Sequence, residues 1–154
     1  MNSTPTRLDI SIRPNPRTEI RVDGDDSRVI ALDLQDYNIV NRFAALLPEL
    51  DAIDAEYTAA IKDKSDDPEG LQAIVAATRD LEARLTAAID TLFDADVCAI
   101  CAGGASLFTP VGGTLLYELI ISQLASLYDD AFTTAVKQRR ARVAKHTAKY
   151  QARK

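Results

Sequence analysis

The chain is poor in aromatic residues and cysteines. Its 154 residues include no tryptophan, four phenylalanines, five tyrosines and two cysteines. Small secreted domains commonly depend on several disulfides, so this cysteine content argues against that class. Aromatic side chains favour sheet and alanine favours helix, so a chain rich in alanine and poor in aromatics is expected to be helical. Its length fits one domain.

Signals for export and membrane insertion are also missing. The N-terminal segment is polar and lacks the apolar core of a signal peptide, so we expect a cytoplasmic protein. The longest apolar segment, Leu107 to Tyr128, contains Glu118 and two glycines. A carboxylate near the centre of a membrane span costs a few kcal/mol. A buried core helix is therefore the favoured interpretation, and we expect no membrane partner.

Charge is distributed unevenly. The net charge is −5, yet residues 137–154 contain eight of the 18 basic residues and no acidic residue. The remaining chain has ten basic against 23 acidic side chains. Such a division predicts two surfaces with different partners, or a tail that neutralises the body of another copy.

Residues 1–32 predict a short strand unit. Apolar and polar residues alternate in two stretches, which is the pattern of half-buried strands. The turn signal Asp23-Gly24-Asp25-Asp26 separates the second stretch from another apolar arm, which predicts a β-hairpin. Pro14 and Pro16 end the first stretch. The apolar positions are Leu8, Ile10 and Ile12, then Ile20 and Val22, then Val29 to Leu32.

Residues 33–136 predict a helical core. Two apolar seams with alternating spacings of three and four are joined by the polar connection Lys62 to Gly70, which predicts an antiparallel helical hairpin. Asp33 or Asp36 can cap the first helix. Pro48 predicts a kink, or a fresh helix starting there. The seams comprise Ile39, Phe43, Leu46, Leu50, Ile53, Tyr57 and Ala60, then Leu71, Ile74, Thr78, Leu81, Leu85, Ala88 and Leu92.

A short helix and a long helix are expected after the hairpin. Asp94 or Asp96 can cap the short helix, which Gly103-Gly104 would end. The long helix is expected to begin at Thr109-Pro110 or Thr114, and its apolar face narrows near Thr133. Residues 137–154 read as its basic continuation. The expected fold is thus mainly α, with an antiparallel helical hairpin, a long C-terminal helix and a small N-terminal β-hairpin.

No catalytic, metal or cofactor motif is complete. Cys98-Ala99-Ile100-Cys101 has redox or metal spacing, but structural zinc needs four ligands and His146 is the only histidine. Acidic residues precede the cysteines, and negative charge raises rather than lowers a thiol pKa. We therefore expect no enzyme, metal or cofactor, and a thiol enzyme is the least favoured hypothesis. The paired acids and glycine pairs are interpreted as caps, turns or solvated residues.

The basic tail is the candidate partner-binding site. Positive side chains on a helix suit phosphates or an acidic protein surface. They also suit the C-terminal end of the helix dipole without any partner. The candidate residues are Lys137, Arg139, Arg140, Arg142, Lys145 and Lys149.

The C-terminal half resembles a known family. Leu92-Phe93-Asp94-Ala95-Asp96-Val97-Cys98, the Gly103-Gly104 turn and an apolar helix ending in Arg139-Arg140 through Lys149-Tyr150 are similar to small helical tail proteins of phages and prophages of Gram-positive bacteria. Members of that family have a turn similar to Leu-Phe-Gly-Glu-Gly-Thr, and Asp94 and Asp96 stand where this turn usually has small or glycine residues. The resemblance implies a tail assembly chaperone or minor tail protein that holds the tape-measure protein.

Two other partner classes remain open. The basic tail also suits a nucleic-acid-associated protein, although no recognition motif accompanies it. The apolar seams can close within one chain or between chains, so a homo-oligomer is a further possibility.

Overall fold

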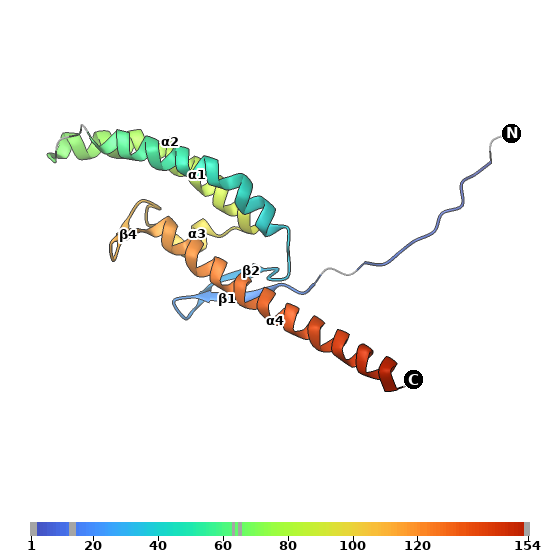
Figure 1. The fold of residues 1–154 in the computed structure, drawn as a ribbon. Coiled ribbons are helices and arrows are strands. Elements are labelled where there is room, and N and C mark those ends of the chain that lie inside the picture. Colours follow the sequence, from blue (N-terminus) through green and yellow to red (C-terminus); the bar gives the residue numbers. More distant parts are fainter. Residues whose placement is uncertain (1–2, 13–14, 63, 65, 153–154) are drawn as a thin grey trace.

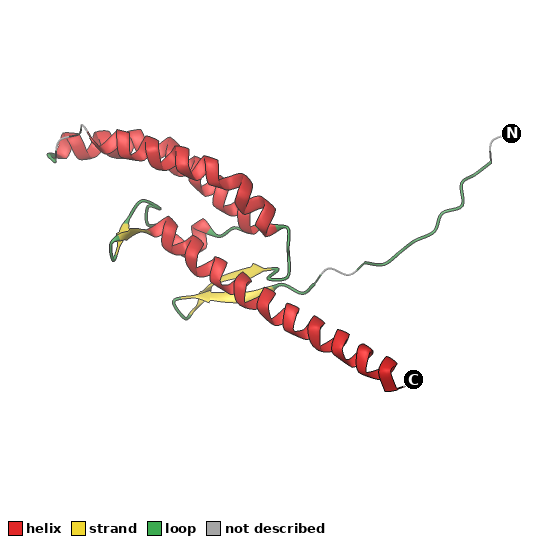
Figure 2. Ribbon diagram, viewed as in Figure 1, coloured by secondary structure: helices red, strands yellow, loops and turns green. Residues whose placement is uncertain are grey.

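The computed structural model describes residues 3–12, 15–62, 64 and 66–152, with backbone alone at 135, 146 and 148–152. This part of the chain is mainly helical, which confirms the expected fold class (Figure 2). The helices are α1 (Ile39–Lys62), α2 (Pro68–Phe93), α3 (Cys98–Ala102) and α4 (Leu116–Ala152). One sheet pairs β1 (Thr18–Val22) with β2 (Asp25–Leu32), and another pairs β3 (Pro110–Val111) with β4 (Thr114–Leu115).

The N-terminal hairpin forms where the sequence predicts it. Asp23 and Gly24 make its turn with φ of 55° and 71°, as a two-residue turn of the type favoured in hairpins requires. Ile20 lies opposite Ile30, so their side chains share one face of the sheet. Ile30 and the neighbouring Leu32 are buried, which anchors the sheet in the core.

The strand expected at residues 8–12 is absent, and that prediction is wrong. Leu8, Ile10 and Ile12 are 87%, 83% and 81% exposed. Figure 1 shows this segment running away from the rest of the chain. Alternating apolar and polar residues form a half-buried strand only where a neighbouring strand and an apolar surface are available. No described residue supplies either of them to residues 8–12.

The two seams form the antiparallel hairpin of α1 and α2 (Figure 1). Ile53 and Leu85 are fully buried within it. Arg84 of α2 adds ion pairs to Glu49 and Glu56 of α1 at 3.1 and 2.6 Å. Leu71 departs from its seam and is 54% exposed, because it lies in the first turn of α2, at the far end of the hairpin from the rest of the core.

Pro48 lies inside a continuous α1, so the alternative of a fresh helix beginning there is wrong. Proline inside a helix removes one hydrogen bond and crowds the carbonyl of the preceding turn, yet the helix continues on both sides of it. Both helices of the hairpin follow a common curve in Figure 1. The packing of α1 against α2 therefore outweighs the free-energy cost of placing Pro48 inside α1.

The connection between the two helices is shorter than expected, because α2 begins at Pro68. The Asp67 carboxylate caps α2 by accepting a hydrogen bond from the Gly70 amide at 2.8 Å. Proline suits this first helical position because its missing N–H has no partner there anyway. Before α1, the Asp36 carboxylate likewise accepts from the Asn38 amide at 3.0 Å, in the turn that leads into the helix.

Neither Asp94 nor Asp96 caps α3, so that prediction is wrong. The Asp90 carboxylate accepts hydrogen bonds from the Val97 and Cys98 amides at 2.9 and 3.0 Å. Asp94 instead ends α2, with a left-handed φ of 51°. Gly103 ends α3 with φ 58°, as the sequence predicts.

Arg28 of β2 joins the N-terminal sheet to the other end of α3. Its guanidinium donates to the Ile100 and Cys101 carbonyls at 3.0 and 2.7 Å. These carbonyls belong to the last turn of the short helix, where positive charge is favourable. Asp90 and Arg28 therefore fasten α3 at its two ends to different parts of the chain.

The start of α4 also differs from the expectation. Gly112 and Gly113, with φ of 57° and 90°, turn the chain between β3 and β4, and α4 begins only at Leu116. Strands of two residues carry too little periodicity to be predicted. The expected loss of burial near Thr133 is confirmed, because every described side chain from there onward is exposed.

Candidate partner-binding surface

The basic residues lie on the part of α4 that projects beyond the core (Figure 1). Among the described side chains, the cations of this segment are exposed and form no ion pair within the chain. They are free to meet an anionic partner. They comprise Lys137, Arg139, Arg140, Arg142 and Lys145; Lys149 belongs to the helix, but its side chain lies outside the described residues.

A narrow apolar stripe runs between these cations. Val136 and Val143 are 44% and 59% exposed. Successive residues of an α-helix are rotated by about 100°, so positions seven apart share a face. On the same geometry, Arg139 and Arg140 lie on either side of the line joining the two valines. The projecting helix therefore offers apolar side chains bordered by positive charge.

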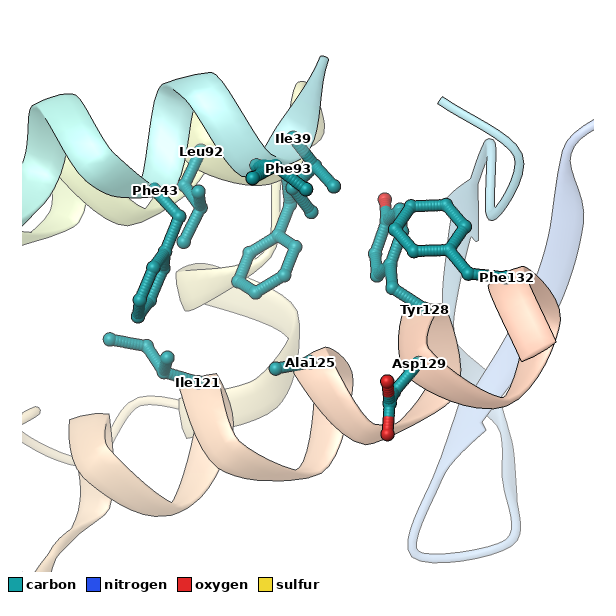
Figure 3. Close-up of a pocket in the computed structure, with 10 residues that line it drawn as sticks. Ile39, Phe43, Leu92, Phe93, Ile121, Ala125, Tyr128, Asp129 and Phe132 are labelled. Carbon is teal, nitrogen blue, oxygen red and sulfur yellow. The ribbon is translucent and has the colours of Figure 1, made fainter. Parts of the chain in front are cut away.

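The stripe continues toward the core along the same face of α4. Ile121, Ala125 and Phe132 lie at spacings of four and seven before Val136 follows at four. In the core these residues border a cavity of about 250 Å³, here called the α1–α4 groove (Figure 3). Its remaining lining residues are Ile39, Val40 and Phe43 of α1, Leu92 and Phe93 of α2, and Tyr128 and Asp129 of α4.

The α1–α4 groove is open and almost entirely apolar. Val40 on its α1 side is 60% exposed, and Phe43 points toward Ile121 across it (Figure 3). Tyr37 packs edge-on against Phe132, with ring centroids 4.8 Å apart. Burial raises the pKa of Tyr128 to about 12, so its hydroxyl stays neutral at physiological pH. Apart from Asp129, the groove therefore offers aromatic and aliphatic contact area.

Sequence reasoning missed the α1 side of this groove. It identified Ile39 and Phe43 as seam residues but did not place Val40. The available signal was a second apolar row at the start of α1, beside the seam that faces α2. A helix with two adjacent apolar rows has more apolar surface than one neighbouring helix can cover.

The two cysteines lie in α3 and are reduced. Burial, with the nearby Asp90 carboxylate, raises the pKa of Cys98 far above its ordinary value. Burial likewise raises the pKa of Cys101 to about 11. Thiolate, the reactive form, is therefore scarce at neutral pH. The environment is that of packed side chains, as the sequence indicates.

The described residues contain no cluster of three or more histidine, cysteine or acidic side chains placed to bind a metal. The side chain of His146 lies outside them. Within the same described residues, none of the helices is both long and apolar enough to cross a membrane. The apolar segment 107–128 is instead divided between a loop, the β3–β4 hairpin and the start of α4.

Comparison with known proteins assigns no relative. No family model matches the chain, and neither the curated proteins nor the solved structures contain a significant match.

Proposed function

We propose that the protein is a non-enzymatic tail assembly chaperone that holds a helical segment of a tape-measure protein along α4. The observation that carries the proposal is the apolar stripe that leaves the α1–α4 groove and continues, between arginines, onto the projecting half of the helix. A helix laid in a groove is recognised through apolar residues at spacings of three and four. The apolar residues of the stripe on α4 are four and seven residues apart, so they can pack against a partner helix whose apolar residues have that periodicity.

Charge indicates the partner's chemistry. Arg139 and Arg140 border the stripe, so a partner helix with acidic residues beside its apolar face is complementary to it. Tape-measure proteins are long and helical, and the resemblance to phage tail proteins names them as the partner. The resemblance of the C-terminal half, which ends in the basic last helix, supports the same assignment.

The proposal is tested by examining the neighbouring genes for a tail cluster and co-expressing the chain with a tape-measure protein, followed by affinity co-purification. Val143→Asp places a carboxylate on the stripe and should abolish co-purification. Ala141→Asp makes the same charge change on the opposite face of α4 and should leave it intact. Both positions are exposed, so neither variant should disturb folding.

Two results would contradict the proposal. Equal binding by the two variants would show that the stripe is not the contact surface. A gene that lies outside any tail cluster, together with no co-purification, would remove the tape-measure protein as partner.

Nucleic-acid binding is the second candidate, favoured by the unpaired cations of residues 137–145. It requires binding that weakens steeply with salt and disappears when 137–154 is deleted. It does not require the apolar stripe. Val143→Asp and Ala141→Asp should therefore weaken nucleic-acid binding equally, which distinguishes the two candidates.

A further inference from the structure

The N-terminal arm, residues 6–12, has the pattern of a half-buried strand without a neighbour. Leu8, Ile10 and Ile12 alternate with Arg7, Asp9 and Ser11. All of them are exposed, and no described residue pairs with this segment. Three large aliphatic side chains on one face of an extended segment are costly to leave in water.

An open sheet edge with an apolar groove lies elsewhere on the molecule. Among the described strands β1 pairs only with β2, so the backbone groups of its other edge are available. Beside β1, a cavity of about 440 Å³ separates the sheet from α4 and is here called the β1–α4 groove. Its apolar lining includes Ile20 and Val22 of β1 and Leu119 and Leu127 of α4.

We propose that the N-terminal arm of one copy adds as an antiparallel strand to β1 of a second copy, with its aliphatic side chains in the β1–α4 groove. Paired residues share a face of a sheet, so placing Ile10 opposite Ile20 sends the arm's apolar face into the groove. Leu8 then lies opposite Val22, and Ile12 opposite Thr18.

Charge supports this register. It places Asp9 opposite Arg21, close to the end of β1 and before the turn that begins at Asp23. Arg21 forms an exposed ion pair with Asp26 at 3.0 Å, which is weak enough to be shared. A parallel strand with Ile10 opposite Ile20 would instead place Asp9 opposite Glu19, where like charges repel.

The connection to β1 favours a second copy over the arm's own sheet. Pairing with its own β1 requires the chain to reverse between Ile12 and Thr18. Pro14 and Pro16 lie in that interval, and each proline favours extended backbone in the residue before it. Arg17 is fixed at the base by hydrogen bonds to the Ala31 and Asp94 carbonyls, both 3.2 Å. From this fixed point the arm points away (Figure 1).

Disulfide trapping distinguishes the two arrangements. The proposed register places Ser11 opposite Glu19, and opposite residues in antiparallel strands have Cα atoms about 4.5–5.5 Å apart, within the span of a disulfide. The Ser11→Cys/Glu19→Cys full-length variant should oxidise to a covalent dimer on a non-reducing gel. The single variants should not. A monomer carrying the new disulfide would show that the arm pairs within its own chain and would overturn the proposal. Failure of the double variant to form any new disulfide would also overturn it.

Sedimentation of the unmodified chain supplies the second test. The wild type should form dimers that Ile10→Asp weakens by more than roughly tenfold, since it puts a charge in the apolar groove. Ser11→Asn introduces a neutral polar side chain of about the size of aspartate on the outer face, where it meets no like charge, and should alter the dimer dissociation constant by no more than roughly fivefold. A monomeric wild type, or equal effects of the two variants, would refute the proposal. All these positions are exposed, and circular dichroism should confirm unchanged helix content.

Discussion

Asp90 provides the sharpest test of how α3 is held. Acidic side chains are unfavourable near the C-terminal end of a helix, and Asp90 lies in the last turn of α2. Its position is explained by the next helix, because its carboxylate accepts from the Val97 and Cys98 amides. Val97 is fully buried and Cys98 is 3% exposed, so water cannot readily replace the carboxylate.

Asp90→Ala should lower the free energy of unfolding by about 2.5 kcal/mol. Each lost bond to a charged acceptor costs about 1.5 kcal/mol, and the better helix propensity of alanine returns roughly 0.5 kcal/mol. In a chain of this size, that loss lowers Tm by about 5–10 °C. Urea titration followed by circular dichroism measures the free energy, and a thermal scan measures Tm.

Two controls accompany this variant. Asp90→Asn keeps an oxygen acceptor and should lose less than half as much. Asp96→Ala removes an exposed carboxylate that sequence reasoning offered as the cap of α3, and should change stability by less than about 0.5 kcal/mol. A loss for Asp96→Ala as large as that for Asp90→Ala would refute the assignment of the cap, as would an unchanged Asp90→Ala.

Three further predictions concern the core, the thiols and the tail. Leu85→Ala should cost about 2–5 kcal/mol in urea titration because Leu85 is fully buried, whereas Leu71→Ala, in the same sequence seam but 54% exposed, should cost less than about 1 kcal/mol. Burial raises the pKa of Cys98 and Cys101 above the ordinary value of 9.0, so both thiols keep their protons in the folded state at a pH where the unfolded chain releases them. The free energy of unfolding contributed by these thiols should therefore be fully present below about pH 9 and fall as the pH rises further. Cys98→Ala should reduce that fall. Deleting 137–154 should change the free energy of unfolding by less than about 0.5 kcal/mol, because the described side chains there are exposed.

Local chemistry and periodicity were enough to predict much of the fold. The hairpin turn follows from Asp23-Gly24, since few residue pairs accept positive φ at both positions. The helical hairpin follows from seams that repeat with the helix period. The end of the core near Thr133 follows from the point where apolar residues become sparse. The basic candidate residues were also visible in the sequence, because charge is read directly from residue type.

Long-range packing decided what the sequence left open or misassigned. Leu71 and Leu85 occupy equivalent positions of one seam, yet only Leu85 has neighbours on every side. Leu8 and Ile20 alternate alike, yet only Ile20 has a paired strand. The α1–α4 groove joins residues from three helices, which no local pattern brings together. Burial and hydrogen bonds depend on neighbours far away in the chain, so the tertiary structure alone determines them.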